Sequence, residues 1–264
     1  MRARDYRKRA RRALRGQWVR VAALLLLACA VLGVLLMIIT FAAMGPLMIS
    51  VFQGLDNMVY GAEATGELVK IPAAFFVIVT IGTLLVSVAE SLLLVGMSGV
   101  GRAVLGGKRP GPRLLFPFRQ LGKAVVMNLV RAAVVGLASL LLIAPGVIAL
   151  YRYSMADYLL AAHPNLGPVE ALRRSARRMK GRKTLLFRLQ ISFLGWAALC
   201  VLPSFAVNLW AGTRFGAAFV ISFAVTLLCG VAALFVAAYL LVAVTDFFRR
   251  ADRGTRKRIK PKSE

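Results

Sequence analysis

Long apolar runs alternate with short basic segments along the whole chain. A run of 18 or more apolar residues is long enough to cross the hydrocarbon core of a bilayer as a helix. The pattern predicts an all-α bundle of about six transmembrane spans. Their expected bounds are 19–44, 71–97, 125–143, 147–162, 185–208 and 215–245. This membrane domain, residues 19–248, lies between a basic segment at 1–18 and a basic tail at 249–264, which we expect to be disordered.

The run at residues 125–162 decides how the chain is threaded. If it crossed the bilayer once, the strongly basic segment 163–188 would lie on the outer side. The positive-inside rule disfavours that arrangement. We therefore expect two antiparallel spans joined by a turn at the hinge residues Pro145 and Gly146. A single long kinked helix is the alternative that the sequence leaves open.

A basic amphipathic helix is expected between the fourth and fifth spans. Pro168 suits a first helical position and Gly181 suits a helix end. The side chains that share an apolar face are Val169, Leu172, Ala176 and Met179. The basic residues are Arg173, Arg174, Arg177, Arg178, Lys180, Arg182 and Lys183. We call residues 168–183 the elbow and expect it to lie in the lipid interface and to bind anionic headgroups.

Composition excludes a soluble domain. Hydrophobic residues make up 59% of the chain, whereas a soluble domain is typically about 45–50% apolar. The net charge of +25 would elsewhere suggest nucleic-acid binding, which we do not expect here because the basic residues lie between apolar runs. Four basic segments are assigned to the cytoplasm: residues 1–20, 98–124, 163–188 and 249–262. The basic residues outside them are Lys70, Arg131, Arg152 and Arg214. This bias predicts that both termini are cytoplasmic. Acidic residues 56–67 and Arg214 fall in the expected outer loops.

Four charged residues fall inside the predicted spans: Glu90, Arg131, Arg152 and Asp157. The threading places Glu90, Arg131 and Asp157 at a common depth, roughly 7–11 Å above the cytoplasmic boundary. We expect them to form one intramembrane polar cluster. The cluster either fixes the register of the helices or lines a site for an ion, proton or headgroup. Arg152 lies nearer the outer half and is expected to extend towards the turn.

No pattern indicates catalysis, a cofactor or a metal site. His163 is the only histidine, and helical spacing does not bring Ser154, Asp157 and His163 together as a triad. The three cysteines, Cys29, Cys200 and Cys229, lie within apolar runs, which argues against a disulfide framework. We therefore expect a protein that is not an enzyme.

The central stretch carries a family resemblance. The residues concerned are Leu141-Leu142, Pro145-Gly146, Tyr153-Ser154-Met155, Tyr158, Ser175, Met179-Lys180-Gly181, Lys183, Leu186-Phe187 and Ser192-Phe193-Leu194-Gly195-Trp196. They resemble the domain-of-unknown-function 975 family of bacterial integral membrane proteins. More distantly, the order of span, elbow and span is similar to the membrane region attached to some glycerophosphodiester phosphodiesterases. The resemblance implies a six-span helical bundle and no established activity.

The sequence favours a multi-pass protein of the bacterial inner membrane. We expect a non-enzymatic lipid-interacting or scaffolding component whose partner is a bilayer with anionic headgroups. One alternative is a small transporter or lipid translocator that uses Glu90, Arg131 and Asp157. Another is an accessory membrane module for phosphodiester or lipid metabolism. The glycine and alanine positions allow a homo-oligomer but do not require one, and no protein partner is indicated.

Overall fold

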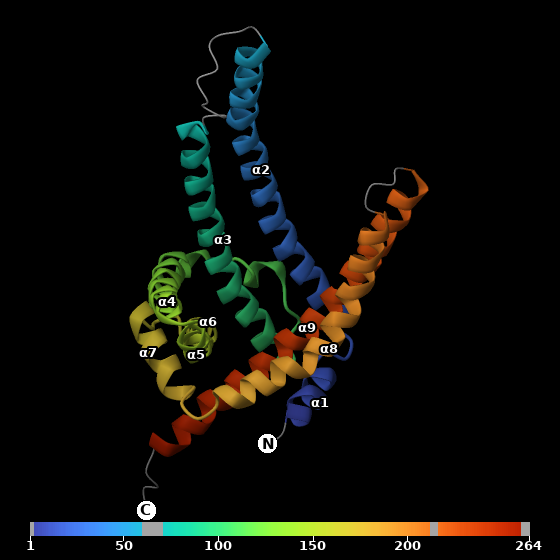
Figure 1. Cartoon of the computed structure of the whole chain (residues 1–264). Helices are drawn as coiled ribbons and strands as arrows, with labels where there is room; N and C mark the ends of the chain where they lie inside the picture. Colours follow the sequence, from blue (N-terminus) through green and yellow to red (C-terminus); the bar gives the residue numbers. More distant parts are fainter. Residues whose placement is uncertain (1–2, 60–70, 212–215, 260–264) are drawn as a thin grey trace, which may run out of the picture. The chain divides into compact units, whose positions relative to one another are not determined.

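The structure, a computed structural model, describes residues 3–59, 71–211 and 216–259 (Figure 1). Within these residues the elements are all helices, which confirms the predicted all-α class. The long helices are α2 (Trp18–Val59), α3 (Ala73–Leu105), α4 (Leu121–Leu141), α8 (Lys183–Ala211) and α9 (Ala217–Ile259). The shorter ones are α1 (Ala3–Ala13), α5 (Ile143–Tyr153), α6 (Ala156–Ala162), α7 (Pro168–Arg178) and the 3-10 turns Pro112–Leu114 and Phe118–Gln120.

Five of the described helical segments are long and apolar enough to cross a membrane. They are Trp18–Leu55, Ala73–Leu105, Pro112–Leu140, Lys183–Trp210 and Val220–Arg253. Large apolar side chains point outward from them: Leu129, Leu140 and Leu228 are 67%, 84% and 72% exposed. Such surfaces are unfavourable in water and suit hydrocarbon. The fold is therefore a helical bundle of several spans.

The chain divides into two compact units, which are described separately: residues 27–91, and residues 1–26 together with 92–264. In the unit of residues 27–91, α2 and α3 approach each other at Gly82. A Cβ atom at that position would overlap the side chain of Ile39. Small residues commonly permit this kind of close helix approach in membrane bundles.

Helix α2 is longer than predicted. The first span was expected to end at residue 44, before Gly45 and Pro46, but α2 continues through both to Val59. Proline is tolerated inside apolar helices because local adjustments and hydroxyl side chains satisfy the backbone groups that it leaves free. The acidic residues at 60–70, like Arg214, lie outside the described residues.

The reversal between α4 and α5 lies earlier than the predicted hinge. Leu142 is extended, with φ −166° and ψ 148°, and α4 and α5 pack against each other on either side of it. Pro145 is the third residue of α5, where no intrahelical hydrogen bond is lost because the first-turn N–H groups have no partner anyway. Gly146 does not turn the chain; it faces α4, and a Cβ there would overlap Ser139.

The segment expected as a short fourth span, residues 147–162, forms two helices. Helix α5 has 11 residues and α6 has 7, and Ser154 and Met155 separate them. Neither helix alone has the roughly 20 residues that cross a bilayer. The prediction that this segment crosses the bilayer therefore requires α5 and α6 to form one span in succession.

Helices α8 and α9 form an antiparallel hairpin (Figure 1). Ser222 donates to Asn208 at 2.8 Å near the hairpin end, and the rings of Phe193 and Tyr239 lie 4.9 Å apart further along. The basic helix α1 packs on α9 and is separated from α2 by Gly16, whose φ is +77°. Tyr6 of α1 is buried, and this burial raises the pKa of its hydroxyl.

The start of the basic tail is ordered, contrary to the prediction. Helix α9 continues to Ile259, with Phe248 and Ala251 buried and the ring of Phe248 6.0 Å from that of Tyr158. Asp252 is buried as well and pairs with a basic residue of the elbow. Packing therefore extends the helix beyond the apolar run. The last residues, 260–264, lie outside the described part.

We predict that Gly146→Ala weakens the contact between α4 and α5. The added methyl overlaps Ser139, and overpacking of this kind costs about 1–3 kcal/mol of unfolding free energy. Gly136→Ala is the matched control, because nothing lies within 4 Å of its added Cβ and alanine favours the helix. Thermal unfolding in detergent should show a lower Tm for Gly146→Ala only. Equal Tm values for both variants would contradict the close contact.

Candidate functional site

The elbow forms the helix that the sequence predicts. Helix α7 begins after Gly167 with Pro168 at its first position, and it ends at Arg178. Gly181, with φ +75°, then turns the chain into α8. Proline at the start and glycine beyond the end are the ordinary boundaries of a helix.

The apolar face of α7 packs mainly against protein, not lipid. Leu172 and Met179 are 4% and 0% exposed, because α7 packs on α4, α5, α6 and α9. Only Val169, which is 44% exposed, remains substantially open. The predicted insertion of the whole stripe into the lipid interface is therefore wrong. An amphipathic helix buries its stripe wherever an apolar partner is available, and here the neighbouring helices provide it.

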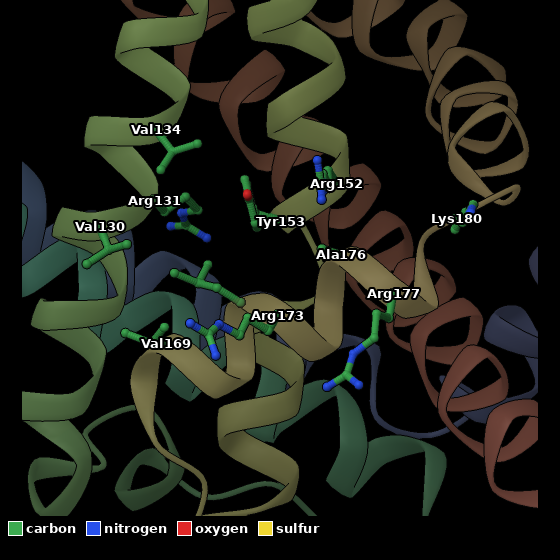
Figure 2. Close-up of a pocket in the computed structure, with 11 residues that line it drawn as sticks. Val130, Arg131, Val134, Arg152, Tyr153, Val169, Arg173, Ala176, Arg177 and Lys180 are labelled. Atoms are coloured by element: carbon green, nitrogen blue, oxygen red, sulfur yellow. The ribbon is translucent and has the colours of Figure 1, made fainter. Parts of the chain in front are cut away.

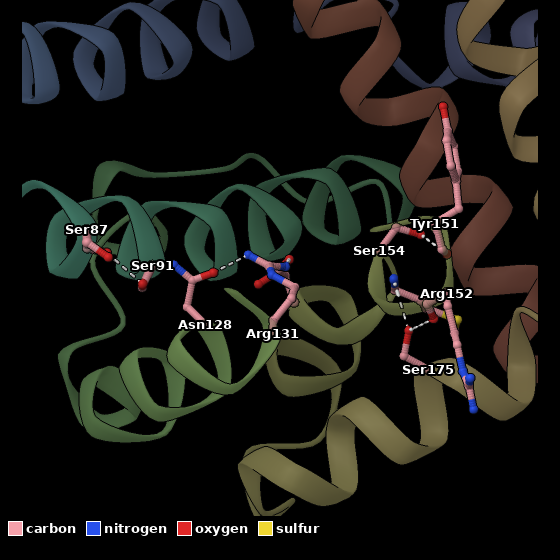
Figure 3. Close-up of polar contacts among 10 residues, drawn as sticks. Ser87, Ser91, Asn128, Arg131, Tyr151, Arg152, Ser154 and Ser175 are labelled. Carbon is pink, nitrogen blue, oxygen red and sulfur yellow. Dashed lines mark hydrogen bonds and ion pairs between the residues drawn. The ribbon is translucent and has the colours of Figure 1, made fainter. Parts of the chain in front are cut away.

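Ser175 ties α7 to the break between α5 and α6. Its hydroxyl accepts a hydrogen bond from the N–H of Met155 at 3.2 Å and donates one to the carbonyl of Arg152 at 3.0 Å (Figure 3). The interruption leaves these backbone groups without helical partners, and a buried unpaired polar group is costly. One fully buried serine thus satisfies both of them.

A recess of about 720 Å³ opens between α4, α5 and α7 (Figure 2). Helix α4 contributes Val130, Arg131 and Val134, and α5 contributes Arg152 and Tyr153. The remaining lining residues come from the elbow: Val169, Leu172, Arg173, Ala176, Arg177 and Lys180. We call this cavity the elbow recess. It brings together residues of the elbow and of the predicted intramembrane cluster, which the sequence presented as separate sites.

The elbow recess has both cationic and apolar lining residues. Its charged lining residues are Arg131, Arg152, Arg173, Arg177 and Lys180, and no carboxylate lines it. A neighbouring hollow of about 460 Å³ shares Arg152 and Lys180 and adds Lys183. Arg152 lies over the ring of Tyr153, 5.8 Å from its centroid. Arg152 therefore lies with the elbow residues. The prediction that it extends towards the turn is wrong.

Arg131 and Asp157 form an ion pair between α4 and α6. A guanidinium nitrogen of Arg131 lies 2.6 Å from a carboxylate oxygen of Asp157, and the two side chains are 17% and 13% exposed. Arg131 also donates to the amide oxygen of Asn128 (Figure 3). Two residues 26 positions apart can meet in this way only because the chain reverses between them. Glu90 belongs to the other unit, and its place beside this pair stays a prediction.

Two elbow arginines face away from the recess. Arg174 pairs with Glu170 one helical turn earlier at 2.5 Å. Arg178 pairs with Asp252 of α9, and both side chains are nearly buried, at 11% and 12% exposed. Sequence analysis did not single out Asp252, because it lies in a basic segment assigned to the tail. The available signal was its position four residues after Phe248 and one after Ala251, which places all three near one face of a helix.

Arg182 and Lys183 follow the elbow helix. Arg182 is half-buried beside Gly181 and does not line either hollow, whereas Lys183 begins α8 and lines the smaller one. Within the described part of the chain, no three histidine, cysteine, aspartate or glutamate side chains come together to hold a metal ion.

The long apolar helices and the cationic recess beside them define a polytopic helical protein suited to a membrane. The family model described as "Protein of unknown function (DUF975)" matches residues 65–253. The chain belongs to this family. No curated protein and no solved structure matches it.

We predict that Arg131 and Asp157 stabilise the fold as a pair. Asp157→Asn or Arg131→Leu alone leaves a nearly buried charge without its partner and should cost about 3 kcal/mol of unfolding free energy. The double variant Arg131→Leu/Asp157→Leu should recover much of this loss, because no charge is then left unpaired. Unfolding in detergent measures all three. Additive losses would show that the pair does not couple α4 to α6.

Proposed function

We propose that the protein is a non-enzymatic component of the bacterial inner membrane that binds anionic phospholipid headgroups in the elbow recess. The observation that carries this proposal is the cluster of basic side chains around one cavity with no carboxylate among the lining residues. Basic pockets beside membrane helices favour anionic headgroups. Lipid binding of this kind also suits a scaffolding component, because bound headgroups would hold such a protein at a fixed position in the bilayer.

Phosphate suits the cationic wall of the recess. Arg173 and Arg177 line it from successive turns of α7, and Arg131 and Arg152 line it from the facing helices (Figure 2). Guanidinium groups donate paired hydrogen bonds to phosphate oxygens, and such charged hydrogen bonds are stronger than neutral ones. Arg131 is already neutralised by Asp157, so Arg152, Arg173, Arg177 and Lys180 supply the excess positive charge.

The apolar wall favours a lipid over a free anion. Val130 and Val134 lie on the recess side of α4, and Val169 and Leu172 lie on α7. Val134 and Val169 are 39% and 44% exposed. A phospholipid covers such side chains with its glycerol and upper acyl groups, which inorganic phosphate does not do. The combination supports an amphiphile as the ligand.

The two alternative functions have less support. A transporter that uses Glu90, Arg131 and Asp157 needs a mobile charge, but Arg131 and Asp157 form a close ion pair, which favours a role in fixing helix register. The accessory module for phosphodiester or lipid metabolism rests on the distant resemblance to the phosphodiesterase membrane region. Neither alternative uses Arg152, Arg173, Arg177 and Lys180, which supply the excess positive charge of the recess.

We predict that Arg173→Gln/Arg177→Gln weakens anionic-lipid binding about tenfold or more, because two charge-assisted contacts to phosphate are lost. Full-length protein in neutral detergent would be titrated with fluorescent phosphatidylglycerol and phosphatidylcholine. Arg109→Gln/Arg113→Gln is the matched control: it removes the same charge from exposed residues outside the recess.

Equal losses in the two double variants would contradict the proposal, since the lipid would then respond to net charge alone. Competition with inorganic phosphate separates a headgroup site from a site for a free anion. Displacement of the lipid by phosphate at millimolar concentration would favour the free anion and contradict a lipid site.

The proposed orientation places both termini and the elbow in the cytoplasm. Single cysteines at Ala144 and His163, on a background without the three native cysteines, test it in intact cells. We expect a membrane-impermeant thiol reagent to label residue 144 from outside and residue 163 only after the cells are opened. Labelling of residue 163 from outside would place the elbow outside and overturn the cytoplasmic orientation.

A further inference from the structure

A second hollow, of about 570 Å³, lies between α1, the start of α2, α8 and α9. It shares no residue with the elbow recess. Its aromatic wall is formed mainly by Trp18, Phe193, Trp196 and Tyr239, and it also has a basic edge. We call it the aromatic groove.

The back of the aromatic groove is held in place by ring contacts. The ring centroids of Trp18 and Tyr239 lie 5.9 Å apart, and those of Phe193 and Tyr239 lie 4.9 Å apart at an interplanar angle of 73°. Phe193 is only 3% exposed, whereas Trp196 is 56% exposed at the front. The groove therefore combines a fixed floor with an open apolar side.

The basic edge comes from α1. Arg7, Lys8 and Arg11 line the groove, and no carboxylate does. Helix α1 presents them there because its other face, with Tyr6 and Ala10, is buried, as is Leu14 just after the helix. Arg7 and Arg11 are one turn apart and so lie side by side on the helix surface. Lys8 and Arg11 are exposed, which leaves their charges available to a ligand.

We propose that the aromatic groove binds one anionic phospholipid, with its phosphate at Arg7 and Arg11 and an acyl chain along the aromatic wall. The charge of the basic edge selects an anion. Trp196 and Tyr239 belong to helices long and apolar enough to cross a membrane, so the aromatic lining that receives the chain lies on segments suited to hydrocarbon. A stacked nucleobase would need an aromatic surface open to water, and this position disfavours it.

The tryptophans provide a direct test. The chain has three, Trp18, Trp196 and Trp210, and only the first two line the groove. Trp210→Phe leaves these two as reporters. In full-length protein reconstituted in vesicles, brominated phosphatidylglycerol should quench their fluorescence at least about twofold more than brominated phosphatidylcholine at the same mole fraction.

Two controls locate the preference. Trp18→Phe/Trp196→Phe leaves Trp210, roughly 21 Å further along α8, and should be quenched equally by both lipids. Arg7→Gln/Arg11→Gln, placed on the Trp210→Phe background, should lose the preference. Arg12→Gln/Arg15→Gln removes the same charge from exposed residues near α1 that do not line the groove, and should keep it.

Equal quenching by the two lipids in Trp210→Phe would overturn the proposal, as would the same preference at Trp210 alone. If Arg7→Gln/Arg11→Gln does not fold, unlabelled lipid provides the second measurement. Excess phosphatidylglycerol, but not phosphatidylcholine, should reverse the quenching by brominated phosphatidylglycerol; reversal by both would again overturn it. Arg173→Gln/Arg177→Gln should leave the preference unchanged, so failure here is distinguishable from failure of the elbow recess.

Discussion

A charge in an apolar helix bundle needs a partner, and the ion pair between Arg131 and Asp157 meets this need for α4 and α6. The pair requires the chain to reverse between the two residues, so it stabilises the hairpin of α4 with α5 and α6. That hairpin provides the surface on which α7 buries Leu172 and Met179. It also holds Arg131 at the edge of the elbow recess. The geometry of the recess thus depends on the ion pair of Arg131 and Asp157, in which each charge is already neutralised by the other.

Periodicity and charge bias predicted much of this fold. The all-α class, the elbow helix from Pro168 and the common depth of Arg131 and Asp157 all follow from local patterns that packing did not override. Apolar length shows that a helix is suited to a membrane, and helical rise converts position into depth. These properties depend on the chain near each residue, which is why sequence alone supplies them.

The structure differs from the sequence predictions where contacts between distant parts of the chain determine the helix ends and the buried surfaces. Proline and glycine suggested breaks at Pro46 and at Pro145-Gly146, but α2 continues past the first, and Leu142 makes the reversal near the second. Gly146 allows α5 to pack closely against α4, because a Cβ there would overlap Ser139. Local sequence spacing does not reveal this contact. The amphipathic stripe of α7 fits lipid and protein equally well on composition. Which of them covers the stripe depends on helices elsewhere in the chain. The ordered helix around Asp252 depends in the same way on its contact with Arg178 of the elbow.

The hydroxyl of Ser175 has a consequence for how the elbow moves. It holds the N–H of Met155 and the carbonyl of Arg152, two backbone groups that α5 and α6 leave open. If α7 detached and lay on the bilayer surface as a separate helix, both groups would lose their partner in an apolar interior. Detaching α7 would therefore leave two buried backbone groups unpaired, which favours an elbow that stays attached to α5 and α6. Slow hydrogen exchange at the Met155 amide would accompany an attached elbow, and the exchange rate of that single amide would report each detachment.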